Sequence, residues 1–147
     1  MARYHATVET RQNAADAFAY LADFSSTAQW DPGVVEAERL TEGPITIGAT
    51  FRVVTLFLGR RIPLDYEVTA LEPGRRVVLR ADNGTIRSTD EITVCAADAG
   101  SVVNYDADLR LLGALRFADP LLRLAFRRIG DRARAGLARE LDRELDR

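Results

Sequence analysis

The chain has 147 residues, of which 47% are hydrophobic and 29% are charged, and its formal net charge is −2. This composition predicts one folded domain over residues 1–147 and excludes an intrinsically disordered chain. The small net charge gives no reason to expect nucleic acid as a partner, and without a membrane-length apolar run or a signal-peptide core we expect a cytoplasmic protein with no transmembrane segment.

The first elements expected are a strand and two short helices. Residues 2–10 alternate as a strand, with Tyr4, Ala6 and Val8 on one face and His5 on the other. Asn13 is the expected N-cap of the helix that follows. A second short helix is expected from Ser25 to Gln29, and the residues 30–33, Trp-Asp-Pro-Gly, end it.

Residues 34–112 form short strands separated by turn signals, which predicts a meander of antiparallel hairpins. The sequence Asn83-Gly84 is the strongest of these signals and predicts a two-residue turn. Strands 62–71, 75–81, 86–94 and 101–111 alternate so that one face of the sheet is apolar and the other polar. Strand 50–58 is apolar on both faces, so its inward face stays open. The expected inward residues of the first two of these strands are Ile62, Leu64, Tyr66, Val68, Ala70, Val77, Leu79 and Ala81.

A long helix is expected at the end of the chain. Asp119 and Pro120 have the residue types of an N-cap and a first helical position, and the helix is expected to run to about residue 146. Its apolar residues follow helical spacing on one stripe: Leu122, Phe126, Ile129, Ala133 and Leu137.

Three segments resemble conserved motifs of one superfamily. They are Ala17–Phe24 with Trp30–Val34 ("F-x-x-L-x-D…W-x-P"), Gly48–Phe51 ("G-T-x-F") and Val68–Val77 ("V-x-x-L-E-P-P-R-R-L"). With the order of elements, they resemble the SRPBCC superfamily, which includes START proteins, birch-pollen allergens and bacterial polyketide cyclases/dehydrases. The resemblance implies an α+β helix-grip fold: a seven-stranded curved antiparallel sheet around the C-terminal helix. It also implies an internal cavity for an apolar ligand.

Ser88 and Asp90 interrupt the apolar face of strand 86–94, because they share parity with Ile86, Ile92 and Val94. In a strand without a bulge both side chains therefore point inward. Burial of a carboxylate raises its pKa and suits it to proton transfer. A bulge, a strand end open to water or a hydrogen bond to a tyrosine would instead make Asp90 structural.

Other ligand contacts are expected from the inner face and from the mouth of the implied cavity. Tyr66 and Tyr105 are expected to line the cavity, and Trp30 is either a lid or a cover for the core. The expected apolar wall is formed by Phe51, Leu64, Phe126 and Ile129.

Other chemistry has little support in the sequence. His5 is the only histidine and points outward, so neither a histidine-based catalytic triad nor a metal site is expected. Cys95 is the only cysteine and has no partner for a disulfide. We expect no cofactor.

Three functions stay open. The first is binding of an apolar or aromatic small molecule, such as a lipid, an isoprenoid or a polyketide-like compound, which the sequence favours over catalysis. The second is a polyketide cyclase, aromatase or dehydratase in which Asp90 is the general acid or base, with Tyr66 or Tyr105. The third is an interaction module that uses an arginine-rich face of the last helix. The apolar hairpin tip at residues 53–58 would pack on the helix or on a second subunit, which leaves a homodimer open.

Overall fold

The expected strands form one antiparallel sheet that curves around an interior. The computed structural model describes residues 2–57 and 59–145. Its strands are β1 (Ala2–Thr10), β2 (Val34–Arg39), β3 (Thr50–Phe57), β4 (Arg60–Glu72), β5 (Arg76–Asp82), β6 (Ile86–Ala97) and β7 (Gly100–Leu111). Its helical segments are α1 (Ala14–Ala22), the 3₁₀ turn η1 (Phe24–Ser26), α2 (Thr27–Trp30), the 3₁₀ turn η2 (Gly113–Ala118) and α3 (Asp119–Leu145).

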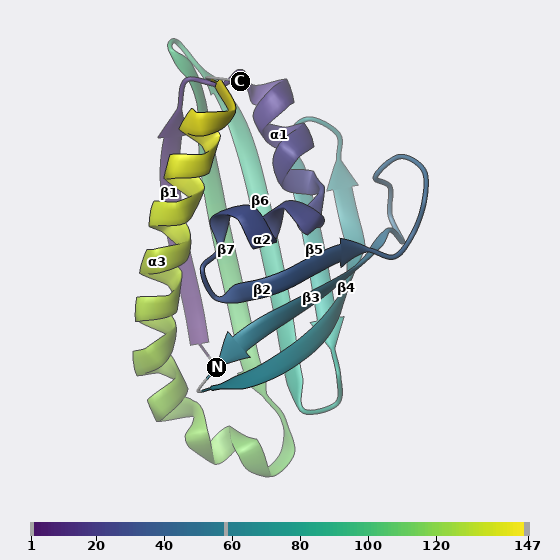
Figure 1. Ribbon diagram of the computed structural model, residues 1–147, viewed down its shortest axis with the longest axis vertical. Helices are drawn as coiled ribbons and strands as arrows, with labels where there is room; N and C mark the ends of the chain where they lie inside the picture. Colours follow the sequence, from purple (N-terminus) through teal and green to yellow (C-terminus); the bar gives the residue numbers. More distant parts are fainter. Residues whose placement is uncertain (1, 58, 146–147) are drawn as a thin grey trace.

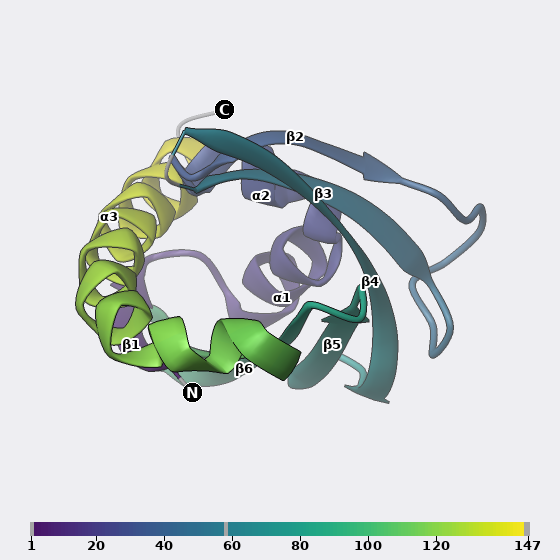
Figure 2. The same ribbon diagram turned by 90° about the horizontal axis from the view of Figure 1, so that it is seen from below.

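The seven strands lie in the order β1-β7-β6-β5-β4-β3-β2, so β2 to β7 form a meander and β1 returns beside β7. Figure 1 shows α3 running along the β1 side of the sheet. Seen from below, the strands curve around α1 and α2 while α3 lies along the remaining side (Figure 2). This is the predicted helix-grip architecture.

The alternating pattern places the buried residues correctly in most strands. Leu64, Tyr66 and Val68 are buried on β4, as expected. A bulge between Val68 and Ala70 then shifts the register, so that Leu71 and not Ala70 packs against the core. The prediction for Ala70 was wrong because an inserted residue reverses the parity beyond it.

On β3, the inward face that the sequence left open is the one that carries Phe51 and Val53, both of which are buried. The last residue of the expected strand, Leu58, lies outside the described residues. Val54 is also largely covered, whereas Leu56 is exposed. Apolar side chains on both faces of β3 are therefore buried only near the middle of the strand, at Val53 and Val54.

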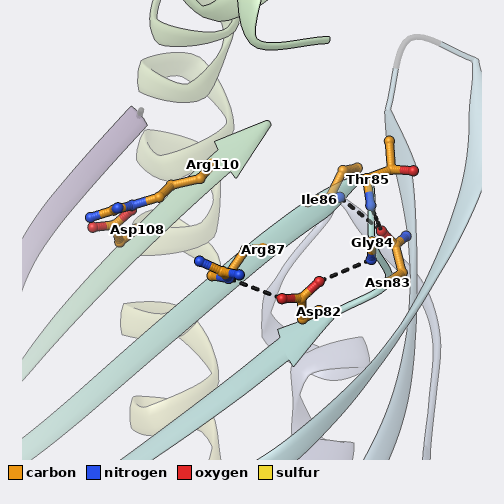
Figure 3. A network of polar contacts seen from close by, with 8 residues as sticks. All are labelled: Asp82, Asn83, Gly84, Thr85, Ile86, Arg87, Asp108 and Arg110. Atoms are coloured by element: carbon orange, nitrogen blue, oxygen red, sulfur yellow. Dashed lines mark hydrogen bonds and ion pairs between the residues drawn. The ribbon is translucent and has the colours of Figure 1, made fainter. Parts of the chain in front are cut away.

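The turn between β5 and β6 is centred one residue later than predicted. Asp82 pairs with Arg87, and the backbone N–H of Asn83 donates to the carbonyl of Ile86 at 3.2 Å, which leaves Gly84 and Thr85 at the turn (Figure 3). The side chain of Asn83 accepts hydrogen bonds from the backbone of both Thr85 and Ile86. Because the backbone of Asn83 pairs with that of Ile86, Asn83 belongs to the base of the turn and not to its centre.

The helices begin close to where their capping residues predict. Asn13 caps α1 by accepting a hydrogen bond from the backbone N–H of Asp16 at 2.8 Å. In place of one helix from Ser25 to Gln29, η1 and α2 follow one another. Asp119 is the first residue of α3 and not the residue before it, because η2 leads directly into the helix.

Two glycines let α3 approach its neighbours closely. A Cβ atom on Gly130 would lie 2.3 Å from the ring of Tyr4 on β1, and one on Gly136 would lie 1.9 Å from the carbonyl oxygen of Trp30. Beyond Gly136, Leu137 and Leu141 are fully buried in the core. The second half of α3 is thus fixed on β1 and α2.

Candidate functional site

The inner face of the sheet carries a buried polar cluster. The pairing of β6 with β5 and β7 runs without a register shift, so Ser88 and Asp90 keep the inward orientation predicted for an unbulged strand. Both residues are buried, with 5% and 4% of their surface exposed. Tyr66 and Tyr105 approach them from β4 and β7, and we call these four residues the tyrosine–aspartate cluster.

Hydroxyl groups in this cluster all direct their hydrogens toward Asp90. The hydroxyl of Tyr66 donates to Ser88 Oγ at 2.8 Å, and Ser88 Oγ donates to Asp90 Oδ1 at 3.1 Å. The hydroxyl of Tyr105 donates to Asp90 Oδ2 at 2.5 Å. The carboxylate thus has a hydrogen bond on each oxygen, which is what a buried charge requires.

Burial determines the protonation behaviour of this cluster. Loss of water raises the pKa of Asp90 from 3.8 to about 6, although the hydrogen bonds from Tyr105 and Ser88 oppose this shift. Burial and the negative charge of Asp90 hold the pKa values of both Tyr66 and Tyr105 well above the ordinary value. The tyrosines therefore stay protonated near neutral pH, whereas Asp90 changes charge within a unit or so of it.

A cavity of about 130 Å³ lies between this cluster and the first half of α3. Its apolar lining comes from β3, β4, β6, β7 and α3, and includes Phe57, Leu64, Leu109, Leu122, Phe126 and Ile129. Its polar lining consists of Asp31, Thr55, Tyr66, Ser88 and Tyr105. The volume is smaller than the roughly 300–1,000 Å³ typical of ligand pockets.

Asp31 is a polar lining residue that the sequence reasoning missed. It follows α2 as the C-cap, and its Oδ1 accepts a hydrogen bond from the backbone N–H of Gly33 at 2.8 Å. Burial raises the pKa of Asp31 to about 6, and its charge contributes to the raised pKa of Asp90. Asp31 was considered only as part of the break after the second helix. Its position directly after Trp30, a residue expected at the mouth of the cavity, is a signal that could have identified it.

The predicted site residues separate into those that line the cavity and those that lie behind its wall. Leu64, Tyr66, Ser88, Tyr105, Phe126 and Ile129 line it. Asp90 lies behind Ser88 and Tyr105, and reaches the cavity only through their hydroxyl groups. Phe51 is fully buried in the core and does not line the cavity.

Trp30 covers the core and does not form part of the cavity lining. Its indole N–H donates to Ser26 Oγ at 3.3 Å, and its ring packs edge-on against Tyr105 with centroids 5.6 Å apart. Phe24 packs in the same way against Tyr66 at 5.0 Å. Both cluster tyrosines are therefore held by an aromatic neighbour as well as by a hydrogen bond.

The remaining candidates lie away from the cavity. Tyr4 is only partly buried, and its hydroxyl donates to Asp131 of α3 at 2.8 Å. His5 points outward, with Nδ1 2.6 Å from Asp106 Oδ1, and Cys95 is exposed. The arginines of the helix face are also exposed: Arg123, Arg127, Arg128, Arg132, Arg134 and Arg139. Within residues 2–57 and 59–145, no helix is long and apolar enough to cross a membrane.

Solved structures share this architecture over nearly the whole chain. The START superfamily protein from Mycobacterium smegmatis has a TM-score of 0.77 at 12% identity, with 95% of this chain and 96% of that chain covered. The Zhui aromatase/cyclase from Streptomyces sp. R1128 has a TM-score of 0.74 at 19% identity, with 97% and 94% covered. Ara h 8.0201 has a TM-score of 0.56 at 14% identity, with 92% and 96% covered. The fold is thus the helix-grip fold of the START/SRPBCC superfamily.

Within that superfamily the chain belongs to the family described as "Polyketide cyclase / dehydrase and lipid transport", whose model matches residues 1–142. None of the curated proteins matches this chain. The family includes both catalysis on polyketides and carriage of lipids, so membership leaves the choice between an enzyme and a binding protein to the cavity itself.

Proposed function

We propose that this chain binds an apolar or aromatic small molecule, such as a lipid, an isoprenoid or a polyketide-like compound, in the cavity between the sheet and α3. The observation that carries the proposal is an apolar cavity with three hydroxyl groups, those of Tyr66, Ser88 and Tyr105, at its inner end. Burial of ligand surface, at roughly 25 cal/mol per Å², supplies the affinity. The hydroxyl groups fix the orientation of the ligand.

The size of the cavity limits what enters the closed form. A dry cavity of about 150 Å³ accommodates benzene, so about 130 Å³ suits a single ring or a short branched chain. A longer ligand requires the first half of α3 to move away from the sheet. Leu121 and Leu124 in this half are largely exposed, so moving it breaks fewer apolar contacts than moving the second half of α3 would.

A substitution that fills the cavity tests the proposal. Ala107 lines the cavity and is nearly buried, so Ala107→Leu should occupy the space and abolish saturable binding of toluene, followed by NMR shifts of cavity methyl groups. Ala81→Leu is the matched control, because Ala81 is also buried but lies outside the lining. Toluene binding that survives Ala107→Leu, or that fails equally in both variants, contradicts the proposal. Native mass spectrometry of protein from its own host then identifies the natural ligand class.

The second candidate is a cyclase, aromatase or dehydratase, and it is favoured by a specific observation. Asp90 has a pKa of about 6 and is connected to the cavity through hydroxyl groups that can relay a proton. In this reaction a C–H bond next to a carbonyl breaks, its proton passes to Ser88 or Tyr105, and the proton of that hydroxyl passes to Asp90. Tyr66 holds Ser88 in this relay, because its hydroxyl donates to Ser88 Oγ.

Hydrogen–deuterium exchange next to the carbonyl of cyclohexanone, a ketone of about the right size, tests this second candidate. We expect a rate that rises as the pH passes through about 6, when Asp90 ionises. Asp90→Asn should lower the rate by roughly 10²–10⁴-fold, the usual contribution of a general base. Rates equal to those in buffer at every pH assign the cavity to binding alone.

A further inference from the structure

The polar face of the sheet, opposite the cavity, forms a groove of about 710 Å³ across β1, β7, β6 and β5. We call this surface the outer groove. Its more basic end is lined by Arg3, Arg80, Arg87, Thr89, Asp108 and Arg110. Neither of the functions proposed above uses this surface.

Two arginines of the outer groove lie directly opposite each other on adjacent strands. Arg87 on β6 pairs with Arg110 on β7 in the antiparallel register. Like charges directly opposite one another destabilise a sheet, so this pair costs stability in the absence of a ligand. Figure 3 shows Arg87 between Asp82 on one side and Asp108 with Arg110 on the other.

The acidic neighbours do not neutralise this end of the groove. Asp108 is shared between Arg3, at 3.3 Å, and Arg110, at 3.5 Å. Asp82 pairs with Arg87 at 3.0 Å, and none of the ion pairs within the described residues involves Arg80. Glu67 on β4 lies opposite Arg80 in the antiparallel register, so these four arginines face three carboxylates.

At the far end of the groove, the carboxylates are already occupied. Glu91 pairs with Arg76 at 2.9 Å, and Asp106 lies 2.6 Å from His5. These two acids therefore make the groove polar along its length without cancelling the excess of arginines at the other end.

From this arrangement we propose that the outer groove binds the phosphate group of a small molecule. A phosphate monoester carries close to two negative charges near pH 7 and three acceptor oxygens, which the facing guanidinium groups of Arg87 and Arg110 can bind together. Guanidinium groups bind such oxyanions through paired, charge-assisted hydrogen bonds. The groove is much larger than one phosphate ion, so the remainder of the ligand occupies the part that reaches toward Glu91.

Backbone NMR titration with glucose 6-phosphate, at constant ionic strength, tests the proposal. We expect saturable shifts of amides in β5, β6 and β7, none with glucose alone and weaker binding of inorganic phosphate. Arg87→Gln and Arg110→Gln should each weaken binding at least tenfold, since each removes a charge-assisted pair of hydrogen bonds. The matched control is Arg52→Gln, because Arg52 is also on the polar face but is paired with Asp65 and lies outside the groove.

The stability of the variants separates binding from folding. Because each substitution removes one of two facing like charges, both variants without ligand should have a thermal midpoint equal to or above that of the native chain. The proposal fails with no saturable shift, with equal affinity for inorganic phosphate and glucose 6-phosphate, or with binding lost equally in the Arg52 variant. None of these outcomes bears on toluene binding in the cavity.

Discussion

At the scale of single residues, Asp90 couples the stability of the fold to pH. Its pKa is about 6 in the folded chain and 3.8 when unperturbed, so the folded chain holds this proton more tightly than the unfolded chain. The contribution of Asp90 to stability is therefore fully present below about pH 4 and is lost as the pH rises through about 6. A shift of about two pKa units corresponds to roughly 3 kcal/mol.

Asp90→Asn should remove this pH dependence, because the amide does not ionise. In urea unfolding at several pH values from 4 to 7, the unfolding free energy of the native chain should fall relative to that of the variant by up to roughly 3 kcal/mol. A ¹³C NMR titration of the Asp90 carboxyl group provides the independent check. A difference between native chain and variant that is constant with pH contradicts the assigned direction.

The site residues that the sequence predicted are those on regular strands. Ser88 and Asp90 could be assigned to the inner face because side chains alternate with a period of two along an unbulged strand. Asp31 could not, since it lies in the turn after α2, where no periodic pattern applies. Asp90 also illustrates a limit of parity, which gives the face of the sheet but not whether another side chain separates the residue from the cavity.

At the scale of elements, the two halves of α3 differ in how they are held. Leu137 and Leu141 are fully buried, whereas Leu121 and Leu124 are mostly exposed and Phe126 borders the cavity. We expect amides of residues 120–129 to exchange hydrogen faster than those of residues 133–141, because local opening breaks fewer buried contacts. Hydrogen-exchange mass spectrometry measures this, and a bound cavity ligand should slow only the first half. Uniform exchange along α3 contradicts opening at this end.

The close contact at Gly136 gives a second test on α3. Alanine normally stabilises a helix relative to glycine by up to about 1 kcal/mol, but a Cβ at Gly136 would lie 1.9 Å from the Trp30 carbonyl oxygen. Gly136→Ala should therefore destabilise the protein by about 1–3 kcal/mol in urea unfolding, as overpacking does. The neighbouring exposed Ala135→Gly reports the propensity alone, at about 1 kcal/mol. A stabilised Gly136→Ala variant disproves the tight packing of α3 on α2.

At the scale of the whole molecule, β1 and β2 are the two edges of the sheet, and α3 lies along β1 but not along β2 (Figure 1). Glu36 and Glu38 are exposed on β2, and charged residues on an edge discourage pairing with another chain. Replacing both by valine should cause self-association that increases with concentration, measured by analytical ultracentrifugation. Glu9→Val is the control, because Glu9 is exposed on β1, the edge strand along which α3 lies. Mass independent of concentration in the double variant shows that the edge is protected in another way.

The order and the faces of the elements were predictable, but the volume of the interior was not. The alternation of strands and the stripe of Leu122, Ala133 and Leu137 are properties of the chain itself, and they predict the sheet and its covering helix. The cavity depends instead on how far α3 stands from β3 and β4, which is decided by contacts between side chains distant in sequence. Two of these contacts involve Gly130 and Gly136, whose role becomes visible only in the structure.

The direction of the hydrogen bonds in the tyrosine–aspartate cluster has a consequence for chemical selectivity. While Asp90 is ionised, Tyr66 and Tyr105 donate their hydroxyl hydrogens to Ser88 and Asp90. Toward the cavity these two hydroxyl groups can therefore act only as hydrogen-bond acceptors. If the cavity binds a ligand as proposed, we expect a phenol or an alcohol to be preferred over a ketone at this pH. Protonation of Asp90 frees one hydroxyl hydrogen, so we expect acidification to shift the preference toward the ketone.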